Sequence, residues 1–214
     1  MSIILFSRPS HDDITSYLYL YSRSLVNLAK EKGYIVSNQE RGDANKKNIS
    51  SVLTKKSPKF IMFNGHGDET KICGHHDETL IEANINHKLL NGSIVYCLSC
   101  SSACTLGPIS VKDGTIAFIG YEDDFALVTD VRYEATPLKD KTAKLFLEPS
   151  NLLVQSILKG NNLLDSLNKC RDKMEDNISK LKTSSDPEAV DILPWLYYNH
   201  IGLVIHGDEQ ARVE

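Results

Sequence analysis

Two short stretches combine the residue types needed for covalent chemistry. "NGHGD" at 64–68 puts His66 between two glycines after an apolar run, and "YCLSCSSAC" at 96–104 puts three thiols after another. A thiolate attacks a carbonyl carbon while an imidazole carries a proton to the leaving amine, so a Cys and a His that meet are the minimum for acyl transfer. The elements around these stretches decide whether they meet.

Short apolar runs separated by polar segments predict those elements. The predicted strands are 3–6, 34–37, 60–63, 94–98, 115–119 and 200–206. Leu and Ile at helical spacing predict one helix from Asp12 or Asp13 to about Lys32, another over 45–56, and several after about Thr136. Asp186 and Pro187 resemble the N-cap and first position of the last helix. This alternation predicts an α/β fold, a three-layer sandwich around a mostly parallel central sheet of about six strands.

The domain organisation follows from the same pattern. No internal repeat or long linker divides the chain, so 1–214 is expected to be a single domain. Its C-terminal portion, about 137–198, is expected to be helical and to be closed by the last strand at about 200–206.

His66 and Cys100 occupy equivalent places in this scheme. Each follows a predicted strand, and the carboxyl ends of parallel strands share one edge of a sheet. The connection between the two strands is long enough for a right-handed crossover, so they are expected to be neighbours. Gly67 lacks a Cβ, which lets its N–H approach a developing oxyanion, and the Cys100 N–H is the expected second donor.

These motifs resemble a known family. An apolar strand ending in Asn-Gly-His-Gly, followed by one ending in Leu-Ser-Cys-Ser-Ser-Ala, is similar to the caspase-like (clan CD) cysteine peptidases, closest to CHAT and gingipain-type domains. "GTIAFIGYEDD" and "NHIGLVIHGDEQARV" look like later strands of that group. The resemblance implies a caspase-like fold, with His66 as acid/base, Cys100 as nucleophile, and Gly67 and Cys100 as oxyanion donors.

The same resemblance suggests how such a protein is used. Relatives are often inactive until a partner or signal rearranges the site, and many cleave one protein target in stress, defence or cell-death pathways. The expected partners are a protein or peptide substrate and a regulatory protein. Two alternatives stay open: an inactive caspase-like scaffold that binds partners, and a metal-binding module.

Other cysteines and histidines define the alternatives at the site. Cys97 lies inside a predicted strand, where a packed core thiol is expected, and Cys104 falls in the first turn of a following helix. A metal-binding module would use the spacing Cys97-x2-Cys100-x3-Cys104 together with His66, His75 and His76. A thiol inside a strand and one beyond a turn converge poorly, so no metal and no cofactor are expected. Alone, His66 is also compatible with an inert turn residue.

Acidic residues suggest a substrate preference. Glu122, Asp123 and Asp124 follow the strand 115–119 at the same edge, where carboxylates suit an Arg or Lys before the scissile bond. This resembles the acidic specificity pockets of gingipains and separases, although a solvated acidic loop fits the sequence too. Arg8, after the first strand, would instead suit a carboxylate.

Composition excludes several other classes. A net charge of −4 and a pI near 6.0 do not favour nucleic acid, and no apolar run approaches the roughly 18–20 residues of a membrane span. The start, "MSIILFSRPS", is read as a strand and not as a signal peptide. Five cysteines, three of them bunched, do not resemble a disulfide framework, which favours a cytoplasmic location.

Overall fold

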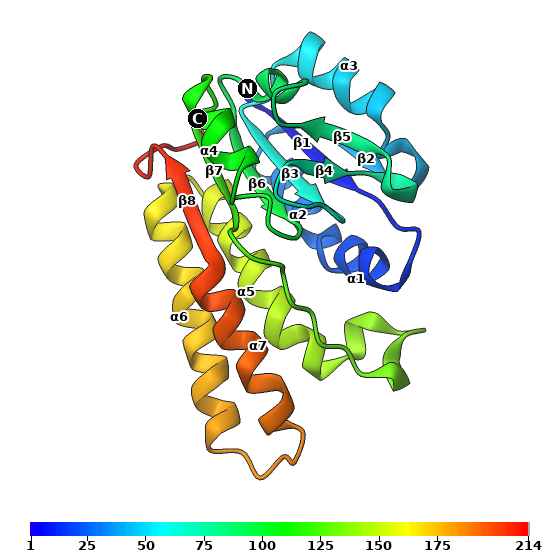
Figure 1. Cartoon of the computed structure of the whole chain (residues 1–214), viewed down its shortest axis with the longest axis vertical. Helices are drawn as coiled ribbons and strands as arrows, with labels where there is room; N and C mark the ends of the chain where they lie inside the picture. Colours follow the sequence, from blue (N-terminus) through cyan, green and yellow to red (C-terminus); the bar gives the residue numbers. More distant parts are fainter. Residues whose placement is uncertain (214) are drawn as a thin grey trace.

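A six-stranded sheet runs through the centre of the molecule (Figure 1), in a computed structural model that describes residues 1–213. The strand order is β2-β1-β3-β6-β7-β8, and every neighbouring pair is parallel except β7 and β8. The strands are β1 Ile3–Arg8, β2 Ile35–Glu40, β3 Phe60–Asn64, β6 Ile94–Leu98, β7 Ala117–Tyr121 and β8 Leu203–Gly207. The predicted α/β fold with a mostly parallel six-stranded sheet is confirmed.

Helices cover both faces of this sheet (Figure 1). One face carries α1 Asp13–Tyr21, α2 Arg23–Glu31, α5 Lys141–Leu158 and α6 Leu163–Lys182. The other carries α3 Lys46–Lys56, α4 Leu106–Lys112 and a hairpin of β4 Lys71–Cys73 and β5 Thr79–Glu82. α7, Ala189–Gly202, packs on α6 and leads into β8. Short 3₁₀ turns occupy Arg41–Asp43, His75–Asp77, His87–Leu90, Val131–Tyr133 and Pro137–Lys139.

The strand sequences explain why both faces are covered. Successive side chains of a strand point to opposite faces. In β3, Phe60 and Met62 join the apolar cluster with α1, α2, α5 and α6, whereas Ile61 and Phe63 join the cluster with α3 and the β4–β5 hairpin. Both clusters are buried, which is why the strands read as continuous apolar runs and not as alternating patterns.

The predicted helix from Asp12 or Asp13 to Lys32 is wrong in one respect, because it breaks at Ser22 into α1 and α2. The cause is the buried side chain of Arg8, whose guanidinium donates to the carbonyl oxygen of Tyr19 and to Ser22 Oγ. An interior carbonyl bonded in this way is no longer free for the helical hydrogen bond from the next turn. The break is therefore a consequence of a residue outside the helix.

The C-terminal part also differs from expectation in its boundaries. The last helix begins after Glu188, because the Asp186 carboxylate accepts the Glu188 N–H in a turn before the helix, so the predicted cap at Asp186 is wrong. The closing strand begins at Leu203, since 200–202 still belong to α7. Residue 214, the end of the expected domain, lies outside the described residues. Within 1–213, no helix has the length and apolar composition needed to cross a bilayer.

Candidate active site

The register of β3 and β6 puts His66 and Cys100 at the same edge of the sheet. Asn64 pairs with Leu98 across the two parallel strands, and the next N–H, that of Gly65, donates to the Leu98 carbonyl at 3.3 Å. His66 and Cys100 each lie two residues beyond the paired Asn64 and Leu98. The structure thus places each residue at the point where the polypeptide leaves one of two neighbouring strands.

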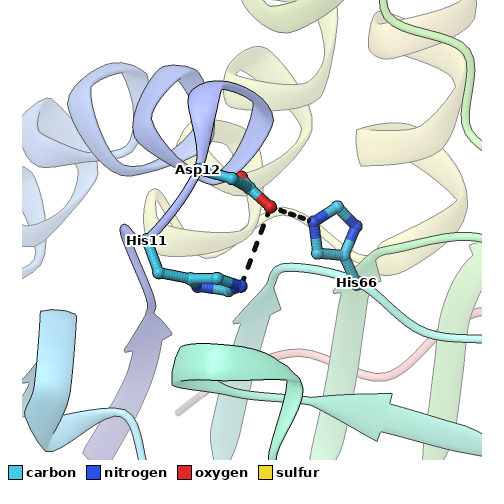
Figure 2. Close-up of side chains that lie close together, drawn as sticks. All are labelled: His11, Asp12 and His66. Atoms are coloured by element: carbon cyan, nitrogen blue, oxygen red, sulfur yellow. Dashed lines mark hydrogen bonds and ion pairs between the residues drawn. The ribbon is translucent and has the colours of Figure 1, made fainter.

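The imidazole of His66 is held by a carboxylate that the sequence did not assign to the site. Its Nε2 lies 2.6 Å from Asp12 Oδ2, and both side chains are partly exposed, at 37% and 39% (Figure 2). Asp12 precedes α1 and comes from the end of β1, the neighbour of β3 on its other side. Residues that follow β1 and β3 therefore meet at this edge.

Asp12 is itself fixed by the start of α1. Its Oδ1 accepts the Thr15 N–H and the Thr15 hydroxyl, each at 2.7 Å, as the N-cap of the helix. Desolvation opposes its ionisation, but hydrogen bonds from Thr15 and His66 outweigh this and lower the pKa of Asp12 to about 2. An ionised carboxylate only accepts hydrogen bonds, so the proton of this bond lies on His66 Nε2, which in a neutral imidazole leaves Nδ1 as the acceptor.

Gly67 lies where a larger residue would not fit. It forms a bridge with Ile72, and a Cβ built on it would meet the Lys71 carbonyl oxygen at 2.7 Å and Ser99 Oγ at 2.9 Å. The hydrogen bonds of this bridge are made by the residues on either side of Gly67 and Ile72, so the Gly67 N–H takes no part in the bridge. Within 1–213, neither this N–H nor that of Cys100 donates to a protein acceptor. Both expected oxyanion donors are thus unengaged.

Cys100 is a half-buried thiol in a sharp turn. Burial raises its pKa above the ordinary value, the nearby Asp124 carboxylate raises it further, and a hydrogen bond from the Phe125 backbone acts in the opposite direction. The following residue, Ser101, has a φ of 49°, a left-handed conformation held by its N–H bond to the Asp123 carbonyl at 2.9 Å. The resting sulfur is therefore a neutral thiol that needs a base to become a nucleophile.

The acidic segment after β7 lies beside this turn. Ser101 Oγ donates to Asp124 Oδ1 at 2.7 Å, so Asp124 is the carboxylate nearest Cys100. Glu122 and Asp123 are exposed and follow β7 at the same edge, with the Glu122 N–H bound to the Gly202 carbonyl. All three predicted specificity residues are exposed, and of the three the Asp124 side chain is the one that lies against the thiol.

Arg8 is not at the site surface, contrary to the expectation that it would face a substrate carboxylate. Its side chain is only 1% exposed, and it donates to Ser22, Asn38, Glu40 and the Tyr19 carbonyl. Its donor groups point into the protein or toward β2. The expectation that Arg8 would be open to a substrate because it ends a strand is therefore wrong. Arg8 ties β1 to β2 and α1.

The remaining thiols differ in burial and do not gather into a ligand group within the described residues. Cys97 is fully buried in β6, where desolvation raises its pKa to about 11, and its sulfur lies 3.0 Å from Ser99 Oγ. Cys104 is exposed in the turns before α4. Among the described residues, Cys97, Cys100 and Cys104 do not form a metal-ligand group with each other or with a histidine. The geometry required by the cysteine-based metal module is absent from 1–213.

Sequence reasoning did not place His11 or Asp12 at this edge, where both lie beside His66. The only signal was the "HDD" run directly after the first strand, which reads as helix capping. An open pocket beside them is lined by His66, Gly67, Asp68, Lys71, Cys73 and Asp77. The side of His66 that faces this pocket is accessible to a ligand.

Comparison with known proteins gives a similarity of fold. No family model matches the chain, and no curated protein matches it significantly. A solved structure, "Complex of Porphyromonas gingivalis RgpB pro- and mature domains", is similar with a TM-score of 0.62 at 13% identity. The match covers 99% of this chain and 48% of that one, so this chain spans about half the length of that relative. At this identity the likeness shows the fold alone, which is caspase-like.

Proposed function

We propose that the chain is a caspase-like cysteine endopeptidase in which His66 and Cys100 form the catalytic dyad. The observation that carries this proposal is the register of β3 and β6, which gives the two residues equivalent positions past neighbouring strands. The carboxylate that holds the imidazole adds support, because general bases in peptidases are oriented by a third group.

The reaction begins with a neutral thiol. His66 Nδ1 takes the Cys100 proton as the sulfur attacks the substrate carbonyl carbon, and Asp12 stabilises the imidazolium through Nε2. The tetrahedral intermediate collapses as His66 returns this proton to the leaving amine, which breaks the peptide bond. Water, activated by the same nitrogen, then hydrolyses the thioester and restores the thiol. The N–H groups of Gly67 and Cys100 are the proposed oxyanion donors, each worth about 2.7–4 kcal/mol where such a donor is well placed.

A basic residue before the scissile bond suits the charge around the thiol. Asp124 lies against the Cys100 turn, with Asp123 and Glu122 exposed beside it, so a guanidinium or ammonium group would be paired there. We expect fluorogenic peptides ending in Arg or Lys to be cleaved faster than one ending in Asp. Cleavage of the Asp peptide alone would contradict this preference.

The setting of the proposed activity follows from the same residues. The five cysteines all lie in the described part and are free thiols, which fits the reducing cytoplasm. The half-buried thiol with a raised pKa suits an enzyme that is latent until a partner protein or substrate rearranges the turn. A role in bacterial stress or defence, as in CHAT-type relatives, is part of this proposal.

Three variants test the peptidase function. Cys100→Ala and His66→Ala should each lower the cleavage rate of a peptide library by at least about 10³-fold, because both groups take part in covalent catalysis. Cys104→Ala removes an exposed thiol four residues away and is the matched control, with an unchanged rate expected. Circular dichroism checks that all three are folded. Equal activity of Cys100→Ala and the wild type would exclude the dyad, and no cleavage by any form would favour the scaffold alternative.

A further inference from the structure

His11 is a buried imidazole with no hydrogen-bond partner. Its side chain is 7% exposed, and neither ring nitrogen is hydrogen-bonded to another group within 1–213. Nε2 nevertheless lies 3.3 Å from Asp77 Oδ1 and 3.7 Å from Asp12 Oδ2, close to two carboxylates but in poor alignment for a hydrogen bond. Buried polar groups are nearly always paired, so a nitrogen in this position needs an explanation.

The surroundings of His11 concentrate groups that bind metals. The donor atoms of His11, Asp12 and His66 all lie within 4.8 Å of one another, and Figure 2 shows the His11 and His66 rings on either side of the Asp12 carboxylate. The rings of His75 and His76 pack against His11, with centroids at 5.2 and 5.4 Å. These residues come from the ends of β1 and β3 and from the turn between β4 and β5.

We propose that His11, Asp12 and His66 bind a divalent transition-metal ion, with zinc as the best fit, and that the bound ion removes His66 from catalysis. Two imidazoles and a carboxylate are ligands that zinc accepts, whereas Mg²⁺ and Ca²⁺ prefer sites made only of oxygens. Three protein ligands leave the fourth position of a tetrahedral ion for water. The Cys100 thiol is not part of this set.

The distances require only small movements of side chains. Zinc bonds of about 2.0–2.1 Å put neighbouring ligand atoms roughly 3.3 Å apart in a tetrahedron. His66 Nε2 and Asp12 Oδ2, at 2.6 Å, would separate slightly, and His11 Nε2, at 3.7 Å from Asp12 Oδ2, would move closer. The ion would replace the proton that now lies between Asp12 and His66, and it would give the His11 nitrogen its missing partner.

The effect on catalysis rests on the proposed function. With the metal on Nε2, a neutral His66 carries its proton on Nδ1, the nitrogen that must accept the Cys100 proton. Asp12 is at the same time occupied by the ion and no longer stabilises an imidazolium. The metal-bound form is therefore inactive, and removal of the ion restores the base.

Metal binding is measured first, on the full chain and without reference to activity. After chelator treatment, titration calorimetry should show one Zn²⁺ per chain, and Co²⁺ should give the visible absorption of a tetrahedral N/O site. His11→Ala and the more conservative His11→Gln should each weaken Zn²⁺ binding at least about tenfold, since each lacks a ligand. His200→Ala, which removes an imidazole bonded to Glu175 on the distant α7, is the matched control and should bind as the wild type does.

Two results would overturn the site. The first is an unchanged Zn²⁺ affinity in both His11 variants when both are folded. The second is a sulfur-to-cobalt charge-transfer band, which would show that Cys100 or Cys73 is the ligand.

Inhibition by the metal is measured separately, on the peptidase activity. Zn²⁺ should inhibit the wild type and inhibit His11→Gln only at concentrations at least about tenfold higher. Equal inhibition of both would overturn the regulatory role, whereas binding without any peptidase activity would retain the metal site and reject the proposed function.

Discussion

At the scale of single residues, Asp12 shows how one carboxylate connects the fold to the site. Oδ1 caps α1 through Thr15, and Oδ2 holds the His66 ring. The helix start fixes the carboxylate, and the carboxylate orients the imidazole. The orientation of the proposed base is therefore set by a local helix signal 54 residues away in the sequence.

The charge beside the thiol leads to a prediction at the same scale. Asp124 disfavours the Cys100 thiolate, so its carboxylate contributes to the raised pKa, after the larger effect of burial. Asp124→Asn removes the negative charge and keeps a hydrogen-bond acceptor for Ser101. The pKa of Cys100 should fall, which raises the thiolate fraction at pH 8, and iodoacetamide should modify Cys100 several-fold faster.

The measurement needs one background change. Cys104 is exposed and would react first, so both proteins carry Cys104→Ser, and the modified residue is identified by peptide mass spectrometry. Rates from pH 6 to 10 should show the Asp124→Asn curve displaced to lower pH. Cys97, whose pKa is about 11 and which is fully buried, serves as the internal control and should stay unmodified in both. Identical curves would show that Asp124 does not act on the thiol.

At the scale of elements, the loop after β3 depends on a close approach of backbone to backbone. A Cβ on Gly67 would lie 2.7 Å from the Lys71 carbonyl oxygen, which belongs to the backbone and cannot rotate away. Gly67→Ala should therefore lower the free energy of unfolding by about 1–3 kcal/mol and displace the His66 segment from the end of β6. Urea denaturation measures the first effect and peptide cleavage the second.

Gly42→Ala is the matched control for this substitution. A Cβ at Gly42 meets only a His75 ring carbon at 4.0 Å, which is ordinary contact, so its stability should change by no more than about 0.5 kcal/mol. If Gly67→Ala were as stable and as active as Gly42→Ala, the close packing of the His66 loop on Ser99 and Lys71 would play no part in the site.

The same elements show what the sequence could and could not predict. The runs at 60–63 and 94–98 identify two fully buried strands, and the glycine and polar residues after them place His66 and Cys100 just past the strand ends, because these signals are local. Arg8 follows a strand in the same way, yet it turns inward to Ser22 and the Tyr19 carbonyl. Which way a side chain turns after a strand depends on partners from other elements. For the same reason Asp12 was recognisable as a cap but not as the partner of His66.

At the scale of the whole molecule, one buried carboxylate connects the two halves of the chain. Asp140 is fully buried and caps α5 by accepting the N–H groups of Thr142 and Ala143. Its other oxygen accepts the Tyr17 hydroxyl at 2.9 Å and the Asp130 N–H at 2.8 Å. Helix α1, the loop after β7 and the C-terminal helices are thus joined at a single side chain, which supports the proposal that the chain is one domain.

This connection predicts how the protein unfolds. Asp140→Ala leaves four donors without their acceptor, two of them fully buried and two partly buried, and should lower the free energy of unfolding by about 2–4 kcal/mol. Asp186→Ala is the control. It removes an exposed carboxylate that also accepts a backbone N–H, and it should lower the free energy of unfolding by no more than about 0.5 kcal/mol.

Two probes of unfolding measure the effect. The single tryptophan, Trp195, reports on α7 by fluorescence, whereas far-UV circular dichroism reports on every helix and strand. Because the two halves share Asp140 and the larger apolar cluster of the sheet, the two signals should give one coincident urea transition in the wild type, shifted equally in Asp140→Ala. A fluorescence transition that moves while the circular dichroism transition stays in place would instead show that α5–α7 unfold as a separate unit.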